Sequence, residues 1–396
     1  MISLADARTQ IQAHLRPLAA RTVPLAEARG RVLREEVRAR EDIPAFDRSA
    51  MDGYAVALED DSAQFRVVGE IQPGANVALQ LQHGEAARIF TGAPLPAGAS
   101  QVLLQEKVRA EGNVITPLER TRTTHVRKRG EDARRGDLLL PAGTRLGAGE
   151  LALLAGIGLT QPRVSPPCRV AHLVTGNELV DPAMEPKSGQ IRDSNSTLVR
   201  AFVHAMGGEL TFQERVADDF ELQFQKVRAL ESSFDLLLVS GGASVGDYDF
   251  GARLLTALGY QIHFTKINLR PGKPTIFATR GPQAAFILPG NPVSHFVVLH
   301  VAVRLALDQL AGATVTWPMV QMPLAGDIAY RPDPRETFWP ARVTAEDGRL
   351  VARALRWQSS GDVTGLTGAN VLLQLSGATT APKAGSPVNF LLLEAP

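Results

Sequence analysis

RVAHLV at 169–174, FDLLLVS at 234–240 and AAFILP at 284–289 are three short apolar runs that decide the architecture of this chain. Segments with apolar residues at helical spacing lie between them, as in NSTLVRAFVHAM at 195–206. The same patterns predict a strand in LTFQERV (210–216) and helices through ELQFQKVRAL (221–230), GARLLTALG (251–259) and SHFVVLHVAVRLALDQLAG (294–312). Strands that alternate with helices imply a parallel sheet covered on both faces. Residues 168–313 are therefore predicted to form an α/β sandwich.

The sequence on either side of this region consists of short β-type runs broken by glycine and proline. On the N-terminal side these runs are FRVVGEI (65–71), ARIF (87–90), QVLLQEKV (101–108) and NVITPL (113–118). On the C-terminal side they are RVTA (342–345), RLVARAL (349–355), NVLLQL (370–375) and VNFLLL (388–393). We predict a β-rich insertion domain at 41–135 and a small β-barrel or sandwich at 314–396.

Helical periodicity appears in two further parts of the chain. LADARTQIQAHLRPL (4–18) and LAEARGRVLREEV (25–37) are predicted to be amphipathic helices. The segment 138–159 returns to helical spacing and is expected to pack beside the early helix. Residues 1–40 and 136–167 would then form one helical or mixed linking module that is discontinuous in sequence.

Composition narrows the class of protein. The 42 Lys and Arg residues nearly balance the 41 Asp and Glu residues, which argues against a nucleic-acid or membrane-surface partner recognised by bulk charge. A local basic cleft remains compatible with this balance. The single cysteine, Cys168, cannot form an internal disulfide, and the segment MISLADARTQ has no secretion-signal pattern. We expect a soluble, cytoplasmic protein.

Three of the predicted strands run into glycine-bearing loops: LVTGNEL (173–179), LVSGGASVGDYD (238–249) and ILPGNPVS (287–294). Ligands of open parallel sheets bind at the carboxyl ends of the strands, and glycine lets backbone amides approach an anion closely. We therefore predict a phosphate-bearing ligand, with Gly241 and Gly242 close to it. No Walker motif, G-x-G-x-x-G, HExxH or G-x-S-x-G is present, which argues against the corresponding nucleotide, zinc-protease and acyl-transfer sites.

Acidic residues follow the same strands. Glu178, Asp193, Asp247 and Asp249 could supply oxygen ligands to Mg²⁺, which takes one or two carboxylates plus phosphate oxygens and water. Three of them have a simpler alternative: Asp193 as a helix cap, Glu178 as a solvated loop acid, and Asp247 as a surface acid.

Basic residues gather in KINLRPGKP (266–274). Lys266, Arg270 and Lys273 suit an oxyanion or pyrophosphate clamp. The alternative is a basic strand that faces water.

Two upstream strings carry less information by themselves. FDRSAMDGYAV (46–56) reads as a turn between β segments, and RKRGEDARRGD (127–137) as a solvated loop. His125, His263 and His295 have no companions at ligand spacing and are expected to be structural or exposed.

Taken together, these strings resemble the molybdopterin molybdotransferase family, which includes MoeA and the E domain of gephyrin. They occur in family order over most of the chain. The matching strings are FDRSAMDGYAV, TGAPLP (91–96), RGED (129–132), PAGTRL (141–146), TGNEL (175–179), DSN (193–195), SGGASVGDYD (240–249), LRPGKP (269–274), LPGNPVS (288–294) and RETF (335–338).

The resemblance implies a transferase that binds adenylylated molybdopterin with Mg²⁺, accepts molybdate and releases molybdenum cofactor and AMP. It also implies a homodimer, a MogA/MoaB-like central domain, and contacts with the upstream molybdopterin adenylyltransferase and with downstream cofactor-modifying or acceptor enzymes. No nucleic acid or membrane is expected as a partner.

The resemblance also assigns roles to individual residues. Catalytic roles fall on Asp52, Asp132, Glu178, Asp249, Lys266 and Arg270. Substrate contacts fall on Lys273, Pro289, Pro292, Ser294 and Arg335, and the metal ligands are Glu178, Asp193 and Asp249. Asp52 and Asp132 lie in the insertion domain, so we expect them to reach the cleft across a dimer interface.

Two positions depart from the family pattern. Asn177 stands where many relatives have Asp, and Arg270 where a lysine also occurs. The alternatives are an adenylyltransferase-like enzyme, which would resemble only about 169–312, a tungstate-inserting paralogue, and a non-catalytic scaffold like gephyrin. No motif separates molybdate from tungstate.

Overall fold

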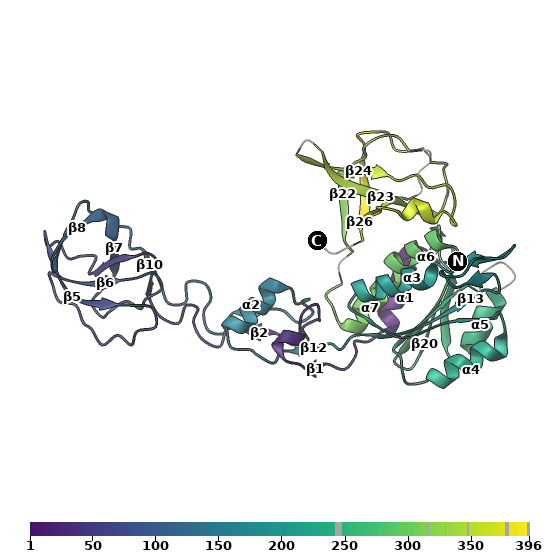
Figure 1. Ribbon diagram of the computed structural model, residues 1–396, viewed down its shortest axis with the longest axis horizontal. Coiled ribbons are helices and arrows are strands. Elements are labelled where there is room, and N and C mark those ends of the chain that lie inside the picture. Colours follow the sequence, from purple (N-terminus) through teal and green to yellow (C-terminus); the bar gives the residue numbers. More distant parts are fainter. Residues whose placement is uncertain (242–247, 316, 329, 347, 377–379, 394–396) are drawn as a thin grey trace. The chain divides into compact units, whose positions relative to one another are not determined.

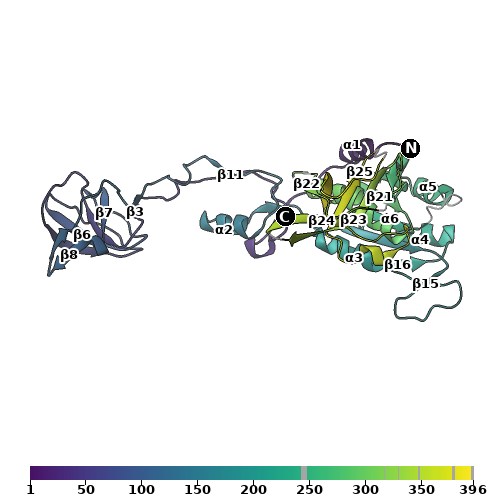
Figure 2. The same ribbon diagram turned by 90° about the horizontal axis from the view of Figure 1, so that it is seen from above.

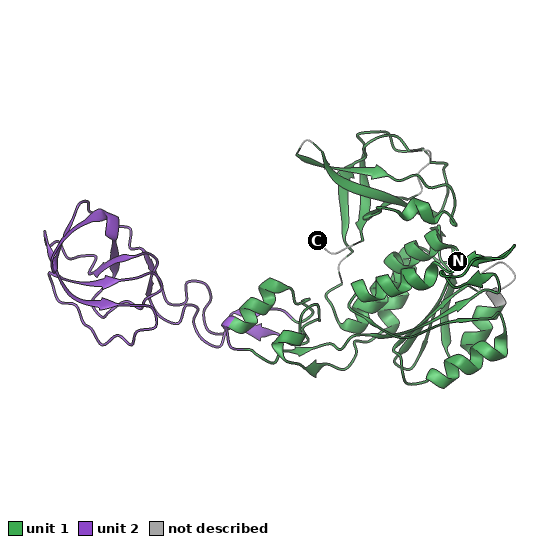
Figure 3. Cartoon of the chain, viewed as in Figure 1, with its two compact units in different colours: residues 1–35, 142–155, 159–396 green, residues 36–141, 156–158 purple. Residues whose placement is uncertain are grey.

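The chain forms two compact units, shown in separate colours in Figure 3. Unit 1 comprises residues 1–35, 142–155 and 159–396, and unit 2 comprises 36–141 and 156–158. The computed structural model describes residues 1–241, 248–315, 317–328, 330–346, 348–376 and 380–393, with the backbone alone at 248 and 249. The finer division into four modules stays a prediction.

A six-stranded sheet forms the centre of unit 1 (Figure 1). Its strands, in spatial order, are β16 (Glu209–Val216), β13 (Arg169–Thr175), β17 (Leu236–Ser240), β21 (Gln283–Leu288), β20 (Pro274–Arg280) and β18 (Gln261–Lys266). The first four strands are parallel, as predicted. Two further strands, which the sequence did not predict, extend the other edge, where β20 is antiparallel to β21 and β18 to β20. Only two residues separate β20 from β21, and so short a connection can join only antiparallel strands.

Helices cover both faces of this sheet, as Figures 1 and 2 show. The predicted helices are confirmed as α3 (Asn195–Ala205), α4 (Phe220–Leu230) and α5 (Tyr248–Ala257). Alternate residues of β17 point to opposite cores: Leu236 and Leu238 pack with α3, whereas Leu237 and Val239 pack against the side of α4 and α5. This alternation places one continuous apolar layer on each face.

The last helix of the α/β region is continuous over Pro292–Ala311, with α6 (Pro292–Val298), a π-helical turn (η3, Leu299–Val303) and α7 (Arg304–Ala311). It is the one helix in the described chain with the length and hydropathy of a membrane span, and 78% of that window is buried inside the protein. It is therefore a core helix of the α/β sandwich.

The N-terminal helix belongs to the same core. The predicted helix is confirmed as α1 (Leu4–His14), and its buried residues Leu4, Ala7 and Ile11 pack in the cluster that contains α7. The expectation that the segment 138–159 packs beside it is wrong, because α7 occupies that face.

The region around 25–37 is not a helix, contrary to prediction. Only a short 3-10 turn (η1, Leu25–Glu27) forms, and Gly30 follows with a φ of 73°. A left-handed glycine ends helical geometry, so the apolar residues beyond it pair as strand instead.

The pairing partners of that region come from the segment after the insertion. β1 (Arg21–Thr22) pairs with β12 (Arg163–Val164), and β2 (Val37–Arg38) pairs with β11 (Leu138–Leu140). Helical structure in that segment is limited to α2 (Ala148–Gly156).

Unit 2 holds a second six-stranded sheet. The predicted runs at 65–71, 87–90 and 113–118 form strands in it. The predicted run at 101–108 is broken by a 3-10 turn, and part of the string 46–56, which reads as a turn, forms a strand. In spatial order the sheet contains β7 (Gln101–Leu104), β4 (Gly53–Val56), β6 (Glu85–Ile89), β5 (Phe65–Ile71), β9 (Val114–Pro117) and β8 (Val108–Glu111), with a 3-10 turn η2 (Gln105–Lys107) after β7. Beside it, β3 (Arg48–Ser49) pairs with β10 (Val126–Arg127).

The C-terminal region of unit 1 is a β domain, as predicted. Its strands are β22 (Met319–Pro323), β23 (Glu336–Glu346), β24 (Arg349–Ala354), β25 (Val371–Leu375) and β26 (Pro387–Leu392), and a 3-10 turn η4 (Val363–Leu366) precedes β25. One edge of this sheet is β19 (Leu269–Arg270), which comes from the α/β region and runs parallel to β23. The sheet therefore incorporates a segment of its neighbouring domain.

Candidate active site

A cavity of about 1620 Å³ lies at the carboxyl ends of the parallel strands of unit 1. It is lined by the loops after β13, β17 and β21, by the start of α3, by the β18–β20 connection and by the C-terminal domain. The predicted site residues that line it are Glu178, Asp193, Gly241, Lys266, Arg270, Lys273, Pro289, Pro292, Ser294 and Arg335. The structure thus brings together residues that are up to 157 positions apart in sequence.

Other predicted site residues lie elsewhere. Asp52 and Asp132 belong to unit 2. Gly242, Asp247 and the side chain of Asp249 lie outside the described residues.

The glycines of two loops allow close packing at the cavity. Gly241 has a φ of 98°, and a Cβ there would lie 2.5 Å from the carbonyl oxygen of Thr175. Gly176 has a φ of 149°, and a Cβ there would lie 2.9 Å from the carboxylate oxygens of Glu178. Side chains at these positions would therefore displace the loop after β13 and the acid that it presents.

Asp193 caps the start of α3, which is the simpler of its two predicted roles. Its Oδ1 accepts a hydrogen bond from the backbone amide of Ser196 at 3.0 Å, and its Oδ2 accepts one from the Ser196 hydroxyl. A carboxylate can accept further bonds on its remaining lone pairs, so capping leaves capacity for a ligand.

The departure at Asn177 has a structural explanation. Its side-chain oxygen accepts a hydrogen bond from the backbone amide of Asp218, and its own backbone amide donates to the Asp218 carboxylate, both at 3.2 Å. This reciprocal pair joins the loop after β13 to the loop after β16. The side-chain oxygen of Asn177 is therefore engaged with the backbone.

An acid that the sequence analysis missed orients two cavity cations. Arg335 donates to both carboxylate oxygens of Asp333, at 2.8 Å and 2.7 Å, and a guanidinium nitrogen of Arg270 lies 3.4 Å from the same carboxylate. Arg270 also donates to the carbonyl of Arg331 at 3.2 Å. The hydrogen bonds from Arg335 lower the pKa of Asp333 to about 2. Asp333 therefore stays ionised and fixes the geometry of both guanidinium groups.

The described lining of the cavity is rich in cations and carries aromatic faces. Its basic residues are Arg192, Lys266, Arg270, Lys273, Arg331 and Arg335, and its acidic residues are Glu178, Asp193 and Asp218. Trp339 and Trp357 contact each other edge to face with ring centroids 4.8 Å apart, and the guanidinium of Arg270 lies 5.8 Å from the Trp357 ring. Such a lining suits a polyanion attached to a flat heterocycle.

Buried polar side chains lie beneath the cavity, at positions that the apolar pattern concealed. His172 lies within the run RVAHLV, and its Nε2 is 2.5 Å from the hydroxyl of Ser240. His295, expected to be structural or exposed, is fully buried and is 3.5 Å from the same hydroxyl. A histidine inside an otherwise apolar strand was the one available signal.

In unit 2, three of the motifs meet. Asp52 of FDRSAMDGYAV accepts hydrogen bonds from the backbone amide and the hydroxyl of Thr91 in TGAPLP, at 2.7 Å and 2.8 Å. These bonds lower the pKa of Asp52. Asp47 accepts a hydrogen bond from the Arg129 amide of RGED at 2.8 Å. Asp132 pairs with Arg127. The strings that looked uninformative singly thus form one polar turn region.

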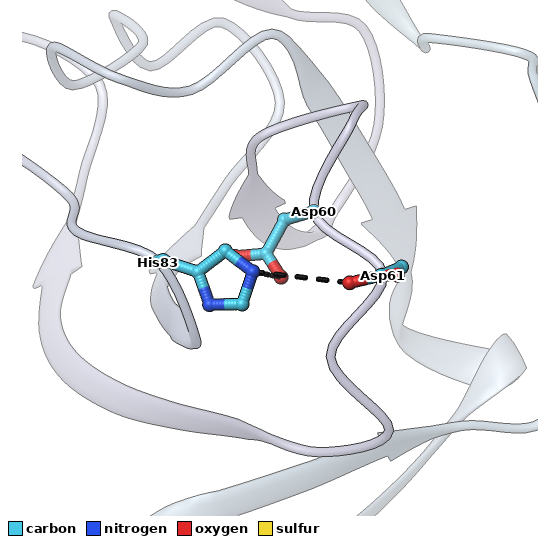
Figure 4. A group of neighbouring side chains, drawn as sticks. All are labelled: Asp60, Asp61 and His83. Atoms are coloured by element: carbon cyan, nitrogen blue, oxygen red, sulfur yellow. Dashed lines mark ion pairs between the residues drawn. The ribbon is translucent and has the colours of Figure 1, made fainter.

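One group of described side chains has the spacing of a three-ligand metal site: Asp60, Asp61 and His83 in unit 2 (Figure 4). Asp60 is buried and stabilises a turn. Its carboxylate accepts hydrogen bonds from the backbone amides of Gly84 at 2.7 Å and Ser62 at 3.0 Å. Glu178 and Asp193 do not form such a group with a third described acid. A metal held by Glu178 and Asp193 would therefore need further oxygen ligands, from a residue outside the described ones, from the substrate or from water.

Comparisons with known proteins cover almost the whole chain. The MoeA N-terminal region (domains I and II) matches residues 2–158, a probable molybdopterin binding domain matches 171–309, and the MoeA C-terminal region (domain IV) matches 323–393.

Individual relatives agree with these matches. The molybdopterin molybdenumtransferase of a Nostoc species is 35% identical, with 94% of this chain and 88% of that protein covered. The Bacillus subtilis enzyme of the same name is 32% identical, with 94% and 89% covered. A crystal structure of the molybdopterin biosynthesis MoeA protein from Pyrococcus horikoshii aligns with a TM-score of 0.83 at 28% identity, over 99% of this chain and all of that one. The chain therefore belongs to the molybdopterin molybdenumtransferase (MoeA) family, a family of transferases in molybdenum cofactor biosynthesis.

Proposed function

We propose that this protein inserts molybdate into adenylylated molybdopterin and releases molybdenum cofactor and AMP. The observation that carries the proposal is the cavity of unit 1, whose described lining combines six basic side chains, three acids and two tryptophans. The substrate has matching parts: a pterin and an adenine that can stack on aromatic faces, and a phosphoanhydride that needs cations. Molybdate is itself an oxyanion and would bind to the same cations.

The side chains divide naturally between these tasks. Lys266, Arg270 and Lys273 would neutralise the phosphates or molybdate, and Arg335 would add a planar donor group from the C-terminal domain. Pro289, Pro292 and Ser294 would shape the pterin or molybdate pocket.

Mg²⁺ is the proposed cofactor. Glu178 and Asp193 would hold it, with Asp249 as a third ligand. Carboxylates beside a phosphate site fit this ion, which keeps several water and phosphate ligands. When bound, Mg²⁺ would withdraw charge from the phosphoanhydride. Lys266 and Arg270 would stabilise the remaining negative charge as the P–O bond breaks.

The remaining proposals concern the assembly. We place the enzyme in the cytoplasm as a homodimer, in which Asp52 and Asp132 serve the cleft of the second subunit. The upstream adenylyltransferase and downstream cofactor-modifying or acceptor enzymes are proposed protein partners, without nucleic acid or membrane.

A reconstitution assay tests the function. The purified protein is mixed with adenylylated molybdopterin, Mg²⁺ and molybdate, and AMP release is followed together with activation of an apo-molybdoenzyme. AMP and active cofactor should appear together and should require molybdate. Binding without turnover would contradict the proposal for molybdate, and repeating the assay with tungstate would then identify a tungsten enzyme.

The adenylyltransferase alternative is not favoured. Family matches extend over the insertion and C-terminal domains, well beyond the α/β region that such enzymes would share. ATP consumption in the absence of molybdate would be needed to revive it.

A further inference from the structure

We propose that a one-directional chain of hydrogen bonds, running from Arg200 through Gln213, His172, Ser240 and His295 to the carbonyl of Pro289, positions the cavity loop after β21. The chain crosses the sheet beneath the cavity. It links α3, β16, β13, β17 and α6 to the loop that carries Pro289, Pro292 and Ser294.

The direction of the first half follows from Arg200. A guanidinium can only donate, and it donates to the side-chain oxygen of Gln213 at 2.6 Å and 3.2 Å. The Gln213 amide nitrogen therefore points inward, where it donates to the Ser196 carbonyl and to His172 Nδ1, both at 2.9 Å. His172 must accept on Nδ1, so its proton resides on Nε2 and is donated to Ser240 Oγ at 2.5 Å.

The direction of the second half follows from the other end. The Pro289 carbonyl can only accept, and it lies 3.1 Å from His295 Nδ1, so that nitrogen carries the proton. His295 Nε2 is then an acceptor, and it faces the Ser240 hydroxyl at 3.5 Å. Ser240 accepts from one histidine and donates to the other, so the two independent assignments meet there without conflict.

Burial makes this order costly to change. His172 and His295 are fully buried and Ser240 is 1% exposed. Burial holds the pKa of His172 well below its usual range and lowers that of His295 to about 4. Both rings are thus neutral, as the chain requires. The charge of Asp193 acts against the lowering of the pKa at His295, and Arg200 carries the charge at the outer end of the hydrogen-bond chain.

The loop after β21 has few other anchors on this side. Asn195 donates to the Gly290 carbonyl at 2.7 Å, and His295 holds the preceding carbonyl of Pro289. Adjacent peptide groups are thereby fixed from below, while the side chains of Pro292 and Ser294 line the cavity. The chain members act through this loop and are positioning residues.

The tautomers are the most direct test, and they require no substrate. In protein labelled with ¹⁵N-histidine, His172 should be neutral with its proton on Nε2, and His295 neutral with its proton on Nδ1 at pH 7. Single substitutions of each histidine assign the signals among the 8 histidines of the chain. An Nδ1 proton on His172, or a positive charge on either ring, would contradict the proposed hydrogen-bond chain.

Gln213→Glu distinguishes a role of Gln213 in the hydrogen-bond chain from a role in packing alone. The variant is nearly isosteric and would pair with Arg200 more strongly, so a packing role predicts unchanged or higher stability. A carboxylate cannot donate to His172 Nδ1, so the chain predicts that the His172 proton moves to Nδ1. Retention of the Nε2 proton in this variant would contradict the inference.

Two His295 variants test positioning through activity, a readout that rests on the proposed function. His295→Asn keeps a donor near Pro289, whereas His295→Gln loses it. In His295→Gln we expect the KM for molybdate to rise roughly ten-fold, with a smaller change in kcat. In His295→Asn we expect a smaller rise in KM. His263→Gln is the matched control, since that ring bonds Thr279 and does not line the cavity. Equal KM values in all three variants would refute positioning, even if the tautomers were as expected.

Discussion

The cavity of unit 1 and the polar turn region of unit 2 both concentrate charged residues, but they hold them in different ways. The side chain of Asp333 is 13% exposed and pairs with Arg270 and Arg335, which line the cavity. A buried hydrogen bond also links His172 and Ser240, and Ser240 is part of the same lining. In unit 2, the pair of Lys128 and Asp47 is 54% and 39% exposed. Exposed ion pairs contribute about 0–1 kcal/mol, so the backbone amides around Asp47 and Asp52 must supply most of the geometry there. A change in the cavity should therefore propagate, whereas one in unit 2 should stay local.

The largest expected effects are on the two separate cores. Phe286→Ala in unit 1 and Phe65→Ala in unit 2 each remove a fully buried ring and should each cost about 3–5 kcal/mol of unfolding free energy. Urea unfolding curves and scanning calorimetry would show whether each variant lowers the midpoint of a different unfolding transition. A single transition that both variants lower equally would remove the basis for treating the units separately.

Acid should destabilise the cavity side next most strongly. The folded pKa of His295 is about 4, below the ordinary 6.5 of the unfolded chain. Between these values the unfolded state binds more protons, so the free energy of unfolding should fall by about 1.4 kcal/mol per pH unit as pH is lowered. His172 shifts in the same direction. Urea titrations at pH 7, 6 and 5 measure the slope, which His295→Asn should reduce.

Glu178→Gln tests the proposed metal ligand. Loss of the carboxylate charge should lower kcat/KM for AMP release by about 100-fold or more, as for removal of a group that stabilises developing charge. Glu111→Gln, an exposed strand position of unit 2 paired with Arg109, serves as the control. Full activity of Glu178→Gln would rule out an essential role for that carboxylate.

Asp333→Asn should have a smaller effect on the same assay. The variant keeps one acceptor for Arg335 but removes the charge that also attracts Arg270. We expect about a ten-fold loss of kcat/KM, mostly through KM, because the cations remain but lose their orientation. An unchanged KM would show that the cavity cations need no such support.

The smallest effect is expected for an exposed pair of unit 2. Lys107 and Glu119 are 45% and 55% exposed and 3.0 Å apart. A double-mutant cycle with alanine at both positions should give an interaction energy below about 1 kcal/mol. A larger value would contradict the view that exposed ion pairs contribute little to unit 2, in contrast to the pairs beside the cavity of unit 1.

The fold was largely predictable where local pattern and tertiary packing agree. The alternation of apolar runs and amphipathic segments predicted the strands β13, β16, β17 and β21 and the helices α3, α4 and α5 correctly. The segment 25–37 failed because Gly30 interrupts a pattern that periodicity alone reads as helix. The packing of α1 on α7 joins the N-terminal segment to the last helix of the α/β region, and periodicity carries no information about such partners.

The site was predictable to the extent that it consists of local strings. Motifs such as LRPGKP and LPGNPVS predicted Lys273 and Ser294, and the structure places both at one cavity. The contacts of Arg270 with Asp333 and Trp357, and those of the buried hydrogen-bond chain, were missed because they join residues far apart in sequence. The order of donors and acceptors in that chain depends on side-chain orientation, which no local pattern encodes.

The strand β19 gives the C-terminal domain an unusual kind of dependence. Leu269 and Arg270 pair with Glu336 and Thr337, so an edge of that sheet is built by a stretch encoded more than 60 positions earlier. A gene fragment that begins after the α/β region would encode a sheet with a missing edge. Recombination at this boundary would thus separate a strand from its sheet, and the two regions should be inherited together.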